Sequence, residues 1–122
     1  MARQSSYDFP AVSKGRREPA KRGETRQEDI FEYDDNKDWK KGESGPKIGS
    51  VRLNHSKEAD PPSAVRAEFA FENGETVTYE GNVPGNGSWK GKGRFEFREG
   101  TGKFKGRGGT LAVDSVNPKR WG

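Results

Sequence analysis

Residues 88–107 read SWKGKGRFEFREGTGKFKGR, and this stretch alternates between two kinds of residue. The odd-numbered positions carry glycine or aromatic residues: Trp89, Gly91, Gly93, Phe95 and Phe97. The even-numbered positions carry charged residues: Lys90, Lys92, Arg94, Glu96 and Arg98. A period of two is typical of a β-strand with one apolar and one solvated face. After a turn at Glu99-Gly100 the alternation resumes, so the stretch predicts an antiparallel hairpin with a basic outer face. A two-residue turn there would pair Phe95 with Phe104.

The composition limits the chain to one domain with a small core. It has 122 residues, of which 27% are hydrophobic. So low an apolar fraction is typical of chains that are partly disordered. The apolar residues lie mostly beyond Ile30, whereas residues 14–26 (KGRREPAKRGETR) are basic and contain Pro and Gly. We therefore predict a disordered basic tail at residues 1–28, a short strand and an acidic, polar loop at 29–46, and an antiparallel β-barrel-like domain at 47–122.

Further strands are indicated by alternating apolar residues at 30–33, 47–54, 65–71, 75–81 and 110–113, which makes six or seven strands with the hairpin. In the first of these, Phe31 and Tyr33 would share one side. A three-residue loop at 72–74, with Gly74 in the left-handed conformation, would pair Phe69 with Val77 on one face, whereas a two-residue turn would separate them. The predicted fold class is therefore all-β: a small antiparallel meander that curls into a barrel.

The run GRFEFREGTGKFKGRGG at residues 93–109 resembles the last hairpin of the allene oxide cyclase-like and dirigent-like β-barrels. The matching motif is G-T-G-x-F-x-G-x-x-G, carried here by Gly100, Thr101, Gly102, Phe104, Gly106 and Gly109. The resemblance implies a closed barrel of eight antiparallel strands with a hydrophobic cavity. It also implies cyclisation or stereochemical guidance of a reactive hydrophobic intermediate. The catalytic residues of that family match no motif in this chain.

Basic residues are the first candidates for a functional surface, because the chain carries a formal net charge of +4 with two basic clusters. The predicted partner-binding residues are Arg16, Arg17, Lys21, Arg22, Lys90, Lys92, Arg94, Arg98, Lys103, Lys105 and Arg107. Surfaces of this sign bind acidic proteins or nucleic acids. The alternative is a solvated face whose lysines discourage pairing at a sheet edge. We expect a binding or structural module with a larger acidic partner, and nucleic-acid binding is an alternative function.

Aromatic residues on the apolar faces are the second candidates. A barrel cavity lined by Phe69, Phe71, Tyr79, Trp89, Phe95 and Phe104 would bind or cyclise a small hydrophobic ligand. Trp39 stands alone in a charged loop, where it either folds back onto the sheet or contacts a partner.

No residue pattern predicts catalysis, a cofactor or a metal site. The single histidine, His55, lies in a polar segment and is expected to be exposed, and no nucleophile elbow accompanies it. The aspartates Asp34, Asp35 and Asp38 lack the glycine and glutamate of a calcium loop. Without cysteines, a signal-peptide pattern or a long apolar run, a cytoplasmic location is expected.

Overall fold

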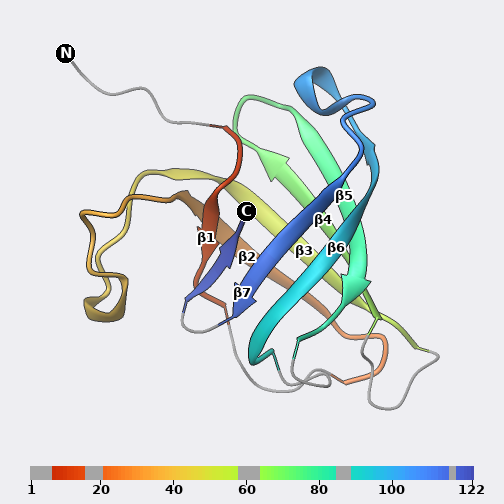
Figure 1. Ribbon diagram of the computed structural model, residues 1–122, viewed down its shortest axis with the longest axis horizontal. Helices are drawn as coiled ribbons and strands as arrows, with labels where there is room; N and C mark the ends of the chain where they lie inside the picture. Colours follow the sequence, from red (N-terminus) through yellow and green to blue (C-terminus); the bar gives the residue numbers. More distant parts are fainter. Residues whose placement is uncertain (1–6, 16–20, 58–63, 85–88, 116–117) are drawn as a thin grey trace.

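The computed structural model describes residues 7–15, 21–57, 64–84, 89–115 and 118–122, and it shows a closed antiparallel barrel of eight strands (Figure 1). The strands are β1 (Ala11–Ser13), β2 (Thr25–Glu32), β3 (Lys47–His55), β4 (Ala64–Phe71), β5 (Thr76–Asn82), β6 (Gly91–Gly100), β7 (Thr110–Ser115) and β8 (Lys119–Trp121), with 3₁₀ turns η1 (Trp39–Lys41) and η2 (Gly102–Phe104). Each strand pairs with the next, and β1 pairs with β8 to close the barrel. The predicted all-β class and antiparallel meander are confirmed.

The barrel begins earlier in the chain than the predicted domain boundaries allow. β1 and the first half of β2 lie within residues 1–28, which we predicted as a tail. Two properties hide these strands from a pattern search. β1 has only three residues, and the side chains that β2 buries include Arg26, Glu28 and Glu32. Phe31 and Tyr33 do share a side, but it is the outer one, because Ile30 points into the core.

The turn between β4 and β5 has the predicted register. Phe69 pairs with Val77, and the Phe71 amide donates to the Glu75 carbonyl at 2.9 Å. Gly74 has φ of +91°, a left-handed conformation that glycine adopts without a Cβ penalty. The three-residue loop at 72–74 is therefore confirmed.

The predicted hairpin around Glu99-Gly100 is wrong in its second strand. β6 pairs instead with β7, so that Phe95 lies opposite Leu111, and residues 101–109 form a loop. The loop's glycines explain the difference, since Gly102, Gly106, Gly108 and Gly109 all have positive φ. A strand cannot contain such a run of left-handed residues. The loop instead folds over the barrel end and buries the Phe104 side chain.

Aromatic rings fill the barrel interior. Trp121 packs edge-on against Phe69 and Phe95, with ring centroids 5.1 and 5.4 Å apart. Phe104 stacks on Phe71 at 5.2 Å, and Phe9, which precedes β1, packs edge-on against Phe69 at 5.0 Å. Edge-on and offset contacts at these separations are the favourable geometries for aromatic pairs. Residues near both ends of the described chain thus complete the core.

Candidate functional site

The aromatic residues predicted to line a cavity form the packed core. All six are buried: Phe69, Phe71, Tyr79, Trp89, Phe95 and Phe104. Ring contacts join them to one another and to two residues that the sequence reasoning missed, Phe9 and Trp121. The interior that we predicted as a ligand cavity is therefore occupied by the protein's own side chains.

The predicted basic residues do not form one surface. Arg16 and Arg17 lie outside the described residues, while Lys21 and Arg22 are exposed in a turn before β2. Lys90 and Lys92 flank the start of β6, whereas Lys103, Lys105 and Arg107 follow its end. A strand of this length spans about 30 Å, so the two groups lie at opposite ends of the barrel.

Several of these cations are neutralised within the chain. On the outer face, Glu80 lies 3.4 Å from Arg66 and 3.6 Å from Arg98. Arg107 and Lys103 lie within 2.8 and 4.0 Å of Asp8. In contrast, Lys92 and Arg94 form no ion pair within the part of the chain that the structure describes. Their charge is available to a partner.

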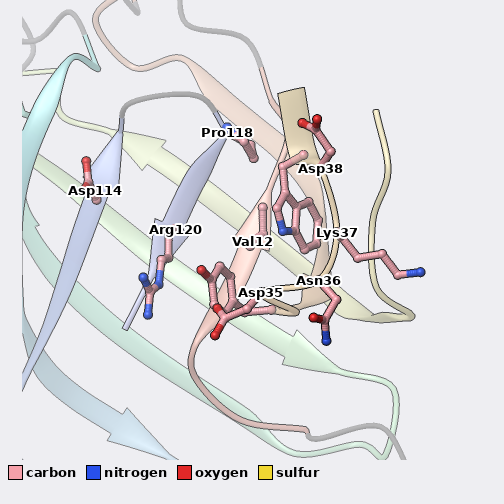
Figure 2. Close-up of a pocket in the computed structure, with 10 residues that line it drawn as sticks. Val12, Asp35, Asn36, Lys37, Asp38, Asp114, Pro118 and Arg120 are labelled. Carbon is pink, nitrogen blue, oxygen red and sulfur yellow. The ribbon is translucent and has the colours of Figure 1, made fainter. Parts of the chain in front are cut away.

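These two cations border a groove on the outer face of β6, β7 and β8. One hollow of about 520 Å³ is lined by Lys92, Arg94, Asp114 and Arg120 among others. A second, of about 500 Å³, shares Asp114 and Arg120 and continues toward the β2–β3 loop, as Figure 2 shows. We call the two adjoining hollows the outer groove. Register explains the juxtaposition, since Lys92, Asp114 and Arg120 are direct neighbours on successive strands.

The β2–β3 loop forms the far wall of the outer groove. Trp39 and Tyr33 lie nearly parallel, at 4° with centroids 6.3 Å apart, and the Trp39 Nε1–H donates to the Asp34 carbonyl. The Arg120 guanidinium stacks on Tyr33 at 4.2 Å, and the Lys14 ammonium lies 5.3 Å from the Trp39 ring. Trp39 therefore folds back against the barrel, the first of the two predicted alternatives. Its loop lines the same hollow as Val12, an outward-facing residue of β1 that is buried.

The two walls differ in charge. The loop wall carries Asp35 and Asp38, and the strand wall carries Lys92, Arg94 and Arg120. A hydrogen bond to Asp35 raises the pKa of Tyr33 above its usual range. On the strand wall, Oδ1 of Asp114 is buried and has no hydrogen-bond partner among the described residues. Cations thus predominate on the strand wall, where Asp114 lies between Lys92 and Arg120. Carboxylates predominate on the loop wall, which also carries Lys37.

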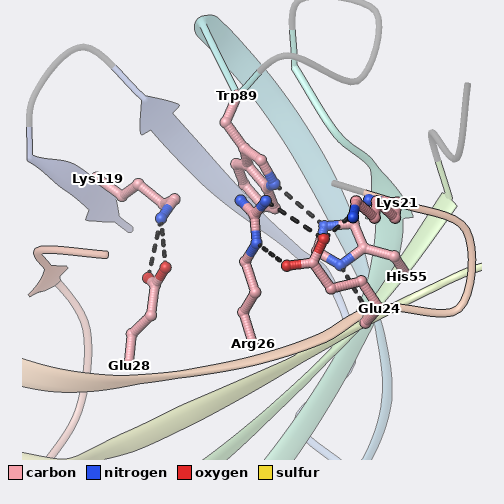
Figure 3. A network of polar contacts seen from close by, with 7 residues as sticks. All are labelled: Lys21, Glu24, Arg26, Glu28, His55, Trp89 and Lys119. Carbon is pink, nitrogen blue, oxygen red and sulfur yellow. Dashed lines mark hydrogen bonds and ion pairs between the residues drawn. The ribbon is translucent and has the colours of Figure 1, made fainter. Parts of the chain in front are cut away.

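A second polar cluster lies inside the barrel, at the end where β3 finishes and β6 and β8 begin (Figure 3). We call this the polar end. The Lys119 ammonium lies 2.7 Å from the Glu28 carboxylate, with both side chains almost fully buried. Lys119 also lies 5.1 Å from the Trp89 ring centroid, and Arg26 pairs with Glu24 at 2.6 Å. Buried charges are stable only when paired, as these are.

His55 belongs to the polar end, so the expectation that it is exposed is wrong. Only 4% of the residue is exposed. Its Nε2 lies 3.2 Å from Nε1 of Trp89, and its Nδ1 lies 3.1 Å from the Glu24 carbonyl. An indole N–H can only donate, so Nε2 accepts and the imidazole carries its proton on Nδ1. Alternation along β3 from Val51 through Leu53 was the available signal that His55 faces inward.

The neutral His55 should make stability depend on pH. Burial is the main cause that lowers the pKa of the imidazole below its ordinary 6.5. The folded chain then binds fewer protons than the unfolded chain, so the stabilisation is complete above about pH 6.5 and is lost as the pH falls through the folded pKa. We expect the free energy of unfolding to fall more between pH 7 and 5 in the wild type than in H55Q, which keeps an acceptor for Trp89 but does not titrate. Urea unfolding at several pH values measures this, and equal slopes would contradict it.

Removing one partner of the Lys119–Glu28 ion pair should lower the free energy of unfolding more than replacing both partners. K119M leaves an uncompensated carboxylate in the interior and should cost about 3–5 kcal/mol in the free energy of unfolding. The double variant K119M/E28L replaces both charges by apolar groups of similar size and should recover most of that loss. Denaturant titration of the two variants tests this. A double variant as unstable as K119M alone would contradict this, because the loss in K119M would then not come from an unpaired Glu28 carboxylate.

Searches against family models, curated proteins and solved structures found no match to this chain. The described residues contain no group of three or more His, Cys, Asp or Glu side chains arranged to hold a metal ion. They also contain no helix of the length and apolarity needed to cross a membrane.

Proposed function

We propose that this barrel is a binding module that docks an acidic segment of a larger protein in the outer groove. The observation that carries the proposal is the contrast between a filled interior and an open basic wall. Lys92 and Arg94 border the groove without an ion pair in the described chain, whereas Arg66, Arg98 and Arg107 are each paired. Carboxylates of a partner would supply the missing counter-charges and would speed association.

An acidic protein fits the outer groove better than a nucleic acid does. Single-stranded nucleic acids bind by stacking bases on exposed aromatic faces. Here each ring that lines the groove carries a cation over one face, Arg120 at Tyr33 and Lys14 at Trp39, and that cation would compete with a stacked base. The carboxylates of Asp35 and Asp38 would also repel a continuous phosphate backbone, whereas a polypeptide can place acidic groups on one wall only.

A barrel that binds a small hydrophobic ligand is the second candidate. The barrel is closed and has eight strands, which is the number that the resemblance to the allene oxide cyclase-like and dirigent-like proteins implies. Against this candidate stand the ring contacts of Phe69 and Phe95 with Trp121 in the interior. An apolar ligand that raises the melting temperature of the native chain would favour it, since such a ligand must bind the folded state.

The first candidate is tested with poly-L-glutamate as the acidic probe. We expect K92E/R94E to weaken binding by about tenfold, because two exposed charge contacts become repulsive. The control K41E/K57E changes the same net charge at two exposed lysines that line neither hollow of the groove. It should weaken binding much less. Fluorescence or calorimetric titration at low salt measures both.

Two results would contradict the proposal. An equal loss of affinity for poly-L-glutamate in both double variants would mean that binding depends only on the net charge of the protein. Tighter binding of a single-stranded oligothymidylate than of poly-L-glutamate, lost in K92E/R94E, would instead assign the groove to nucleic acid.

A further inference from the structure

A site at the end of the barrel opposite the polar end is occupied by the chain's own N-terminal segment. Both oxygens of the Asp8 carboxylate accept from Arg107, at 2.8 and 2.9 Å, in a bidentate pair. Lys103 lies 4.0 Å from the same carboxylate. The pair lowers the pKa of Asp8 below its ordinary 3.8, so the carboxylate is charged at neutral pH. We call this the aromatic end.

The next residue, Phe9, enters the barrel beside that ion pair. Its ring packs edge-on against Phe69, Phe71 and Tyr79, with centroids 5.0 to 5.9 Å apart. The loop at residues 101–109 closes over the Phe9 ring. The Phe104 and Phe9 ring centroids lie 6.4 Å apart, and the Arg107 guanidinium stacks on the Phe104 ring at 4.4 Å. Two adjacent side chains, one acidic and one aromatic, thus fill two adjacent subsites, one cationic and one aromatic.

We propose that the aromatic end is a recognition site for an acidic-aromatic segment of a partner protein, and that Asp8-Phe9 is its intramolecular occupant. Arg107 and Lys103 receive the carboxylate, and Phe69, Phe71 and Tyr79 receive the ring. The site shares no residue with the outer groove, so it is a second docking surface and does not rest on the function proposed above.

Three features make the occupant displaceable. The side chains of Asp8 and Arg107 are 27% and 33% exposed, so the ion pair is open to solvent and to competing carboxylates. Phe9 is partly buried rather than enclosed. The strand that follows, β1, pairs with its neighbours over only three residues. The segment's tether gives it an effective concentration in the millimolar range. A partner segment with the same two side chains displaces it by adding contacts of its own.

The test uses the full chain and an acetylated, amidated peptide of sequence YDFP, which corresponds to residues 7–10. In the variant D8N/F9A the cationic subsite loses its charged occupant and the aromatic subsite loses its ring, while the β1 sequence is unchanged. We expect this variant to bind the peptide at least tenfold more tightly than the wild type does, because its own segment no longer competes. The heteronuclear NMR signals of Arg107 and Phe104 should shift on titration.

Variants of the peptide and of the protein distinguish specific recognition from non-specific binding. A peptide with Asn for Asp, or with Ala for Phe, should each lose at least tenfold in affinity for D8N/F9A. Adding R107Q to D8N/F9A should remove binding, whereas adding K92E/R94E should leave it intact and so distinguish this site from the outer groove. If D8N/F9A does not fold, the same titration of D8N and of the wild type with excess peptide gives the competition directly.

A folded D8N/F9A chain that shows no shift at Arg107 or Phe104 with millimolar peptide would overturn the proposal. Equal affinity of the wild type and D8N/F9A would overturn it as well, because the intramolecular segment would then not occupy the binding site.

Discussion

Closure of the sheet into a barrel obliges this chain to fill one narrow interior with its own side chains. An eight-stranded barrel leaves a space that side chains can just fill. Only 27% of the residues are hydrophobic. Large aromatic rings and smaller aliphatic side chains share the interior, and the rings include Trp89, Phe95 and Trp121. Phe9 and Trp121 reach this interior from the two ends of the described chain and pack against the same ring, Phe69.

The interior divides along the barrel axis into an aromatic end and a polar end. At the polar end the Lys119–Glu28 pair and the His55–Trp89 hydrogen bond take the place of apolar packing. Such groups contribute little net stability compared with a well-packed apolar core, but they penalise alternative arrangements that leave any of them unpaired. We infer that the polar end fixes the register in which β8 closes against β1, since Lys119 lies in β8 and its partner lies in β2.

Sequence patterns predicted the central strands well because those strands follow the simplest rule. β3, β4 and β5 alternate apolar and polar residues, and parity alone selected the loop at 72–74. The same rule failed at β2, whose inward residues include charged groups that find partners far away in the chain. It failed again at residues 101–109, where alternating glycines mimic a strand but adopt left-handed conformations.

The predicted basic face was misplaced for a related reason. Parity placed Lys103 and Arg107 beside Lys92 and Arg94 on two paired strands, but the loop carries them to the far end of the barrel, where Asp8 neutralises them. No sequence pattern links Asp8 to Arg107, because they are 99 residues apart and only barrel closure brings them together. The two docking surfaces that we propose follow from this division of the cations.

The most direct test of the self-filled barrel is an aromatic NOE spectrum of the full chain. We expect contacts between the ring of Phe9 and those of Phe69 and Phe104, together with contacts between Trp121 and Phe95. A spectrum in which Phe9 and Trp121 show contacts only to their sequence neighbours would contradict it, because the barrel would then be neither closed nor filled by its own ends.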